Sequence, residues 1–178
     1  LVLATLHTND APGAVARLSD MGIEHYLLSS AFNGAVAQRL ARMVCAGCTT
    51  KYYPPEQVLS DAGIPDHAGR AFKKGAGCTR CHNSGFAGRV GVYEVFEVTP
   101  DIRRMIHHAR PTHELRDAAR RAGGLSLREE GVLLAVDGKT SLEEILRVTQ
   151  NDDDANETAA PAKRSEERRV GKECRSRW

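Results

Sequence analysis

Apolar residues change their spacing along the first part of the chain. Residues 1–6, LVLATL, are a short apolar run that ends at polar HTND, which predicts a buried strand. Asn9 or Asp10 can then cap a short helix that ends at Gly22. One or two further helical turns and a strand over residues 39–44 are expected next. The opening part of the chain therefore predicts an α/β fold.

Residues 45–98 have the composition of a loop-rich module. They contain eleven glycine and proline residues, and only residues 56–62 predict a helix. Residues 89–98, RVGVYEVFEV, alternate well enough to predict a strand or one arm of a hairpin. A segment with so few core residues needs a cross-link, such as a structural metal ion or disulfides, to stay folded.

Helical spacing dominates residues 99–149. Thr99 precedes a proline at one helix start, and Pro111 opens the next helix. Ser126 and Ser141 each begin a capping box, with a glutamate three residues later and apolar residues at helical spacing behind it. We expect four short helices that form a small helical subdomain.

These patterns divide the chain into five predicted segments. Residues 1–44 are expected to belong to a larger core, because a buried strand at the first residue implies neighbouring strands. The loop-rich module 45–98, the helical subdomain 99–149 and an acidic, disordered linker 150–163 follow. Residues 164–178 resemble the translation of a sequencing adapter, and excluding them leaves 19 basic and 20 acidic residues. A genuine basic tail is the alternative, and it would keep the formal net charge at +2.

Four cysteines stand in two C-x-x-C pairs, Cys45 with Cys48 and Cys78 with Cys81, with 29 residues between the pairs. Zn²⁺ prefers tetrahedral ligation, and each C-x-x-C turn presents two sulfurs, so two turns complete the shell. The pattern predicts a structural zinc site. Such a site can contribute on the order of 10 kcal/mol to folding, which suits a module that is poor in core residues.

Two other interpretations of the cysteines stay open. Cys78, Cys81 and His82 spell C-x-x-C-H, the attachment signature of a c-type haem, although this leaves the other pair without a role. Disulfides or thiols that bind no metal are the remaining possibility, and disulfides are rare in a reducing cytosol. If zinc is bound, His82 is a bystander or a group that supports the ligands.

Polar residues gather where the first predicted strand ends and a helix begins. Ligands of open α/β sheets bind at the carboxyl ends of strands, and a helix N-terminus offers unpaired N–H groups to a phosphate. This place is therefore a candidate phosphate site, although a single histidine beside a strand is more often structural. The cluster comprises Thr5, His7, Thr8, Asn9 and Asp10.

Two glycine patterns resemble nucleotide-binding motifs and are rejected. Gly138, Lys139 and Thr140 look like the end of a phosphate loop, but Leu133 stands where G-x-x-x-x-G-K-[ST] requires a glycine. The other pattern lacks the dinucleotide-binding spacing and predicts turns beside the metal: Gly85, Gly88 and Gly91.

The order of the motifs resembles that of the traffic ATPases of type II secretion and type IV pilus assembly. LATLHTNDAPGAVARLSDMG is similar to the His box of that family. AQRLARMVCAGC and GCTRCHNSGFAGRVGVYEVFEV are similar to its tetracysteine region, and ELRDAARRAGGLSLREEGVLLAVDGKTSLEEILRVT to its helical end. The resemblance covers residues 1–149.

This resemblance implies an α/β fold: the C-terminal part of a RecA-like P-loop NTPase core, with a tetracysteine zinc-binding insertion and a small helical C-terminal subdomain. It implies a cytoplasmic homo-hexamer, peripherally associated with the inner membrane, that hydrolyses ATP with Mg²⁺ and moves an inner-membrane platform protein. In this family the phosphate loop and the Mg²⁺-binding motifs precede the His box. The segment alone is therefore expected to be inactive.

The resemblance also implies roles for single residues. His7, with Thr5 nearby, would act catalytically beside the γ-phosphate, and His7 and Thr8 would contact the nucleotide. Gln38 and Arg39 match the family's Q-R-L sequence, for which we expect a structural or intersubunit role. A surface salt bridge is an equally good explanation of Arg39.

A zinc-ribbon module that binds nucleic acid or another partner is the alternative function. Such an interface predicts a basic face with interleaved aromatic residues. The chain is close to neutral and only 5% aromatic, so we expect no nucleic-acid partner. Its 41% hydrophobic and 27% charged residues are typical of a soluble globular protein, and no apolar run approaches the roughly 20 residues of a membrane helix.

Overall fold

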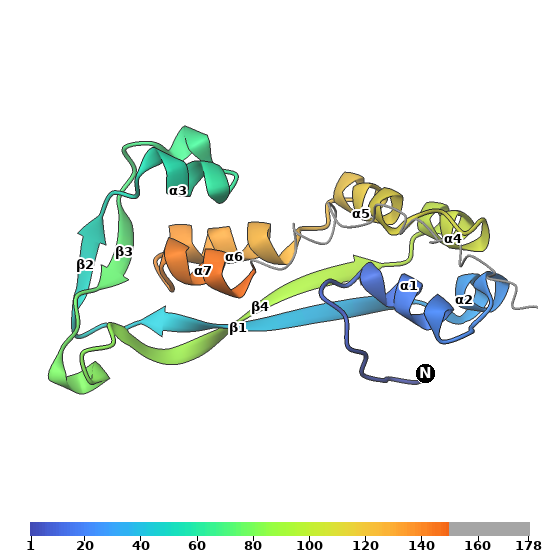
Figure 1. Cartoon of the computed structure of the whole chain (residues 1–178), viewed down its shortest axis with the longest axis horizontal. Coiled ribbons are helices and arrows are strands. Elements are labelled where there is room, and N and C mark those ends of the chain that lie inside the picture. Colours follow the sequence, from blue (N-terminus) through green and yellow to red (C-terminus); the bar gives the residue numbers. More distant parts are fainter. Residues whose placement is uncertain (150–178) are drawn as a thin grey trace, which may run out of the picture.

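The framework of the computed structural model is an antiparallel ribbon of two long strands, β1 (Gly34–Val44) and β4 (Phe86–Glu97). The structure describes residues 1–149, so the predictions for residues 150–163 and 164–178 lie outside the described residues. The ribbon forms the long axis of the molecule, with helices along it (Figure 1). Within the described part of the chain, no helix is long and apolar enough to cross a membrane.

Alternation along the ribbon gives it one covered and one open face. On β4, Val92 and Phe96 are buried, whereas Tyr93 and Val95 are 48% and 60% exposed. Successive side chains of a strand point to opposite faces, so the predicted strand in this region is confirmed. β1 begins at Gly34, earlier than the predicted residue 39. Through its pairing with β4, β1 joins residues 1–44 to residues 45–98, which the sequence pattern predicted as separate segments.

The strand predicted over residues 1–6 is wrong, because this segment is irregular. Leu1, Val2 and Leu3 are 107%, 89% and 89% exposed. A strand needs a neighbour that accepts and donates its backbone hydrogen bonds. Among the strands of residues 1–149, none pairs with this segment. The apolar pattern indicates that a segment suits a sheet, but it does not provide the partner.

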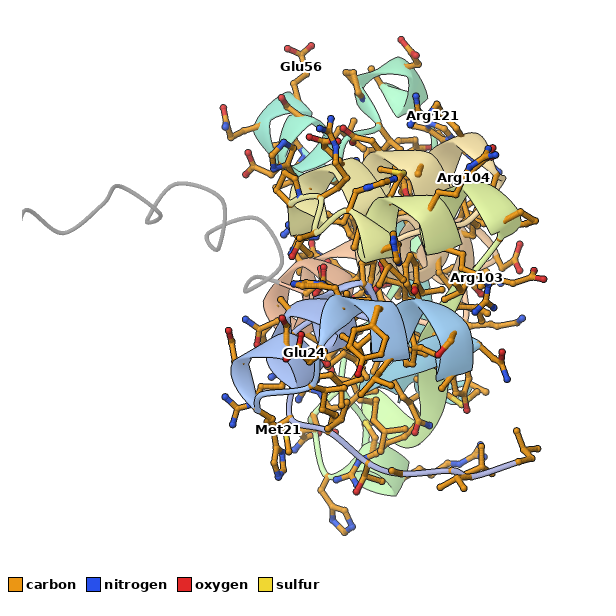
Figure 2. All side chains as sticks on the ribbon, turned by 90° about the vertical axis from the view of Figure 1, so that its right-hand side faces the viewer. Met21, Glu24, Glu56, Arg103, Arg104 and Arg121 are labelled. Atoms are coloured by element: carbon orange, nitrogen blue, oxygen red, sulfur yellow. The ribbon has the colours of Figure 1, made fainter. Side chains whose placement is uncertain are left out.

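The first hydrophobic cluster lies at one end of the ribbon. In the end-on view of Figure 2, α1 and α2 lie below α4 and α5, and Arg103 lies between the two pairs, where it donates to the carbonyl oxygen of Ser29. The predicted helix before Gly22 is confirmed as α1. The helices are α1 (Gly13–Asp20), α2 (His25–Ala31), α4 (Pro100–His107) and α5 (Thr112–Arg121). The cluster comprises Ala11, Val15, Leu28, Phe96, Val98, Ile102, Ile106 and Leu115.

The second hydrophobic cluster joins the loop-rich module to the last two helices. The loop-rich module contains a second antiparallel strand pair, β2 (Thr49–Tyr52) with β3 (Phe72–Gly75). Between these strands in the sequence lies α3 (Glu56–Asp61), which confirms the helix predicted over residues 56–62. These elements contact α6 (Leu127–Val136) and α7 (Leu142–Val148). The cluster comprises Ala41, Leu59, Ala62, Phe72, Val92, Leu127, Val132, Leu134, Ala135, Leu142 and Ile145. The remaining short turns are the 3-10 helices η1 (Pro65–His67) and η2 (Thr79–Cys81).

The four predicted C-terminal helices are present, and most of their caps are as expected. The Thr99 hydroxyl accepts the backbone N–H of Ile102, and Ser126 forms a reciprocal capping box with Glu129. The second predicted box is only half formed. Ser141 accepts the backbone N–H of Glu144, but the Glu144 carboxylate binds arginine side chains instead of the Ser141 amide.

Candidate functional site

The four cysteines predicted as metal ligands meet at one end of the ribbon. Cys45 directly follows β1 and Cys48 directly precedes β2, while Cys78 and Cys81 lie at the two ends of η2. Each pair is folded into a tight turn, since the second amide donates to the first carbonyl oxygen at 3.2 Å in both. The four Sγ atoms all lie within 4.8 Å of one another, so the group could hold a metal ion.

The spacing of the sulfur atoms fits a tetrahedral shell. The Sγ atoms of Cys45 and Cys78 are 4.0 Å apart, those of Cys48 and Cys81 3.8 Å, and those of Cys78 and Cys81 3.7 Å. A Zn–S distance of about 2.3 Å gives tetrahedral edges of about 3.8 Å. A disulfide would bring two sulfurs to about 2.05 Å. All four side chains are instead free thiols.

Backbone amides make Cys81 suited to the thiolate form that a metal needs. Its Sγ accepts the N–H of Cys78 at 3.2 Å and that of Gly85 at 3.3 Å. Burial favours the neutral thiol, but these hydrogen bonds lower the pKa of Cys81 to about 6. Burial raises the pKa of the neighbouring Cys48 to about 12. Metal binding would displace protons from this group of thiols.

Glycines allow the chain segments on either side of the second cysteine turn to approach each other closely. A Cβ atom at Gly75 would lie 1.9 Å from the carbonyl oxygen of Gly85, and Gly85 itself has a φ of +77°. The carbonyl oxygen of Gly85 also accepts the N–H of Cys45 at 2.9 Å. Gly85 therefore lies beside the cluster as predicted. Gly88 and Gly91 lie within β4 instead, so the prediction of turns at these two positions is wrong.

His82 does not belong to the cysteine group. Its side chain is exposed, and its backbone has a φ of 50°, in the left-handed region. The group of possible ligands in residues 1–149 contains the four cysteines alone. The position of His82 agrees with the bystander role expected if zinc is bound.

Residues 5–10, which were predicted to contact a nucleotide, lie far from the cysteines, at the other end of the ribbon in Figure 1. Thr5 and His7 are exposed and Thr8 is half-buried, all on the irregular chain before α1. Their proposed roles stay predictions. The Oδ1 atom of Asp10 accepts the N–H of Gly13, the first residue of α1, at 3.1 Å, but Pro12 occupies the N-cap position that was predicted for Asn9 or Asp10.

Three side chains hold residues 9–11, just after His7, and the sequence pattern did not predict these contacts. Arg39 of β1 donates to the carbonyl oxygen of Asn9 at 3.3 Å, and Arg116 of α5 forms an ion pair with Asp10. Glu94 of β4 accepts the N–H of Ala11 at 2.8 Å. One signal was visible in the sequence, because Glu94 places a carboxylate on the core-facing side of an alternating strand.

Residues 138–140, which resemble the end of a phosphate loop, serve instead to fasten the chain to β1. The Thr140 hydroxyl donates to the carbonyl oxygen of Arg42 at 2.8 Å, and the Lys139 carbonyl oxygen accepts the N–H of Val44 at 3.0 Å. Gln38, also on β1, donates to the Tyr93 hydroxyl at 3.1 Å on the open face of the ribbon. These contacts are structural ones within the chain.

Comparisons with known proteins identify the family. A family model described as "Type II/IV secretion system protein" matches residues 1–147. The type II secretion system protein HxcR of Pseudomonas aeruginosa is 45% identical over 151 residues, which are 85% of this chain and 29% of that protein. The type IV pilus assembly ATPase PilB of Thermus thermophilus is 40% identical over 151 residues, 84% of this chain and 17% of that protein.

A third relative has the same extent of similarity. The type II secretion system protein E of Pseudomonas aeruginosa is 41% identical over 152 residues, 85% of this chain. The chain spans less than a third of the length of each of these relatives. With the match to residues 1–147, the similarity confirms that the chain belongs to the type II/IV secretion system protein family.

Proposed function

We propose that this chain is a C-terminal segment of a traffic ATPase that couples ATP hydrolysis to type II protein secretion or type IV pilus assembly. The observation that carries the proposal is the family match over residues 1–147, a range that includes His7, both cysteine turns and nearly all of the last helix. Relatives named as secretion proteins and as pilus ATPases match equally well, so both processes remain within the proposal.

The four cysteines are proposed to bind one structural Zn²⁺. The sulfur separations of 3.7–4.0 Å and the two N–H···S hydrogen bonds to Cys81 support this proposal. A filled Cys₄ shell leaves no open position for a substrate, so the ion would brace the fold and take no part in the reaction. It would fix β2 and β3 to the end of the β1–β4 ribbon.

His7 is proposed to act beside the γ-phosphate of ATP, with Thr5 and Thr8 nearby. Phosphoryl transfer depends mainly on positioning and on charge stabilisation, which an imidazole can supply. The chain contains no G-x-x-x-x-G-K-[ST] sequence, so the phosphate loop and the Mg²⁺ ligands would come from the part of the relatives that it does not span. The 178-residue chain alone would then hydrolyse no ATP.

The assembled machine is proposed to be a cytoplasmic homo-hexamer that contacts an inner-membrane platform protein. Support comes from the names of the relatives, which belong to secretion and pilus systems.

The test uses the full-length protein that carries this segment. We expect His7→Ala to lower the ATPase kcat at least about tenfold with little change in nucleotide affinity, because positioning contributes to the transition state. His113→Ala, which removes an exposed histidine from α5, is the matched control. An unchanged kcat in His7→Ala would remove the proposed role of His7, and a full-length protein without ATPase activity would refute the function as a whole.

A further inference from the structure

Residues 9–11 are held by one contact from each of three elements that surround them. Arg39 on β1 binds the carbonyl oxygen of Asn9, Glu94 on β4 binds the amide of Ala11, and Arg116 on α5 binds the side chain of Asp10. The chain before residue 9 is irregular and its first five residues are exposed. These contacts therefore determine where the His7 segment leaves the folded body.

Asp10 is the only one of these three residues that is held through its side chain. It is 8% exposed, and each carboxylate oxygen has its own partner: Oδ1 accepts the N–H of Gly13, and Oδ2 accepts Nε of Arg116. A buried carboxylate is costly without a partner, so the two helices α1 and α5 are joined through this group. A shift of α5 would move Asp10 with it.

His7 lies three residues before Asp10, so at most about 11 Å of extended chain separates them. We propose that Arg116 is a positioning residue that acts on His7 through Asp10. The ion pair between Arg116 and Asp10 would then link the orientation of helix α5 to the position of His7. This inference rests on the proposed role of His7. It adds that the helical subdomain adjusts the reaction through a specific pair of charges.

The site also permits a variant that removes the charge without collapsing the fold. A cavity of about 100 Å³ adjoins the pair, and its lining includes the polar residues Glu94, Arg120 and Ser126 beside apolar ones such as Phe96 and Leu127. Water can enter a cavity of this size on its polar side and bind the groups that a shorter side chain leaves. Arg116→Gln keeps a hydrogen-bond donor and removes the guanidinium. Arg110→Gln is the matched control, because Arg110, just before α5, forms an exposed ion pair with Glu114 on that helix.

The experiment is a double-mutant cycle on the ATPase activity of the full-length protein. We expect Arg116→Gln to lower kcat about tenfold with KM changed less than about threefold, since a small displacement of a catalytic group costs rate. In the His7→Ala background, Arg116→Gln should lower kcat by less than about twofold, because the two residues act through one step. Arg110→Gln should leave kcat unchanged in both backgrounds.

A merely structural role predicts different results. If Arg116→Gln multiplies the loss caused by His7→Ala, or leaves kcat unchanged while His7→Ala lowers it, the inference is overturned and the proposed function stands. If His7→Ala itself leaves kcat unchanged, the proposed role of His7 fails and the inference fails with it. The swapped pair Asp10→Arg with Arg116→Asp provides a second check, and we expect it to recover part of the kcat that either single change loses.

Discussion

The carboxylate of Glu144 on α7 accepts both the backbone N–H and the guanidinium of Arg42 on β1, at 3.0 Å and 2.7 Å. Its side chain is 0% exposed, and Arg147 supplies a second guanidinium at 2.7 Å. Arg42 lies three residues before Cys45, so this network fastens the last helix to the strand that leads into the cysteine cluster.

Removing the Glu144 charge should destabilise the chain. Glu144→Gln leaves the half-exposed guanidinium groups of Arg42 and Arg147 with a weaker, uncharged acceptor, and we expect the free energy of unfolding to fall by about 2 kcal/mol. Urea unfolding of the 178-residue chain measures this. Glu114→Gln, which breaks the exposed pair with Arg110, should cost less than about 1 kcal/mol. Equal losses in the two variants would show that burial of the Glu144 network does not matter.

The same network predicts a loss of stability in acid. Burial favours the protonated carboxyl group, but hydrogen bonds from Arg147 and Arg42 lower the pKa of Glu144 to about 2. A carboxylate whose pKa is lower in the folded state stabilises the fold above its unfolded pKa of about 4.3. That contribution is lost as the pH falls from about 5 towards 2. Unfolding midpoints measured across this range should fall less steeply in Glu144→Gln than in the unmodified chain.

Removal of the metal should affect the last two helices as well as the loops. Leu59 and Phe72 of the loop-rich module share a hydrophobic cluster with Leu142 and Ile145, whereas α4 and α5 pack in the other cluster. After chelation, hydrogen exchange should rise over residues 45–85 and over α6 and α7, and should stay low in α4 and α5. Equal loss of protection in all four C-terminal helices would contradict this division.

A single methyl group should disturb the cysteine cluster. Gly75→Ala places a Cβ atom 1.9 Å from the carbonyl oxygen of Gly85, whose amide donates to Cys81. We expect zinc affinity, measured by competition with a chromophoric chelator, to fall about 10- to 100-fold, as when the groups that support metal ligands are changed. Gly69→Ala is the control, because its φ of +78° gives backbone strain but its Cβ has no neighbour within 4 Å. An unchanged affinity in Gly75→Ala would show that the backbone can move aside.

Local features were predictable because their causes lie within a few residues. Helix α3, the cap at Ser126 and the two cysteine turns depend on neighbours in the sequence, and the structure contains them. The pairing of β1 with β4, the binding of Glu144 by Arg42 and that of Asp10 by Arg116 depend on residues far apart in the chain. No local pattern specifies such partners. The prediction at residues 1–6 failed for the same reason, since a strand is defined by its neighbour.

The proposed zinc site joins two turns that are far apart in the sequence through Cys45, Cys48, Cys78 and Cys81. X-ray absorption at the zinc edge, together with the zinc content of the purified protein, tests it most directly. We predict one zinc per chain, surrounded by four sulfur atoms at about 2.3 Å. A folded protein without zinc, or a zinc shell that contains a histidine nitrogen, would show that the four cysteines do not form this site.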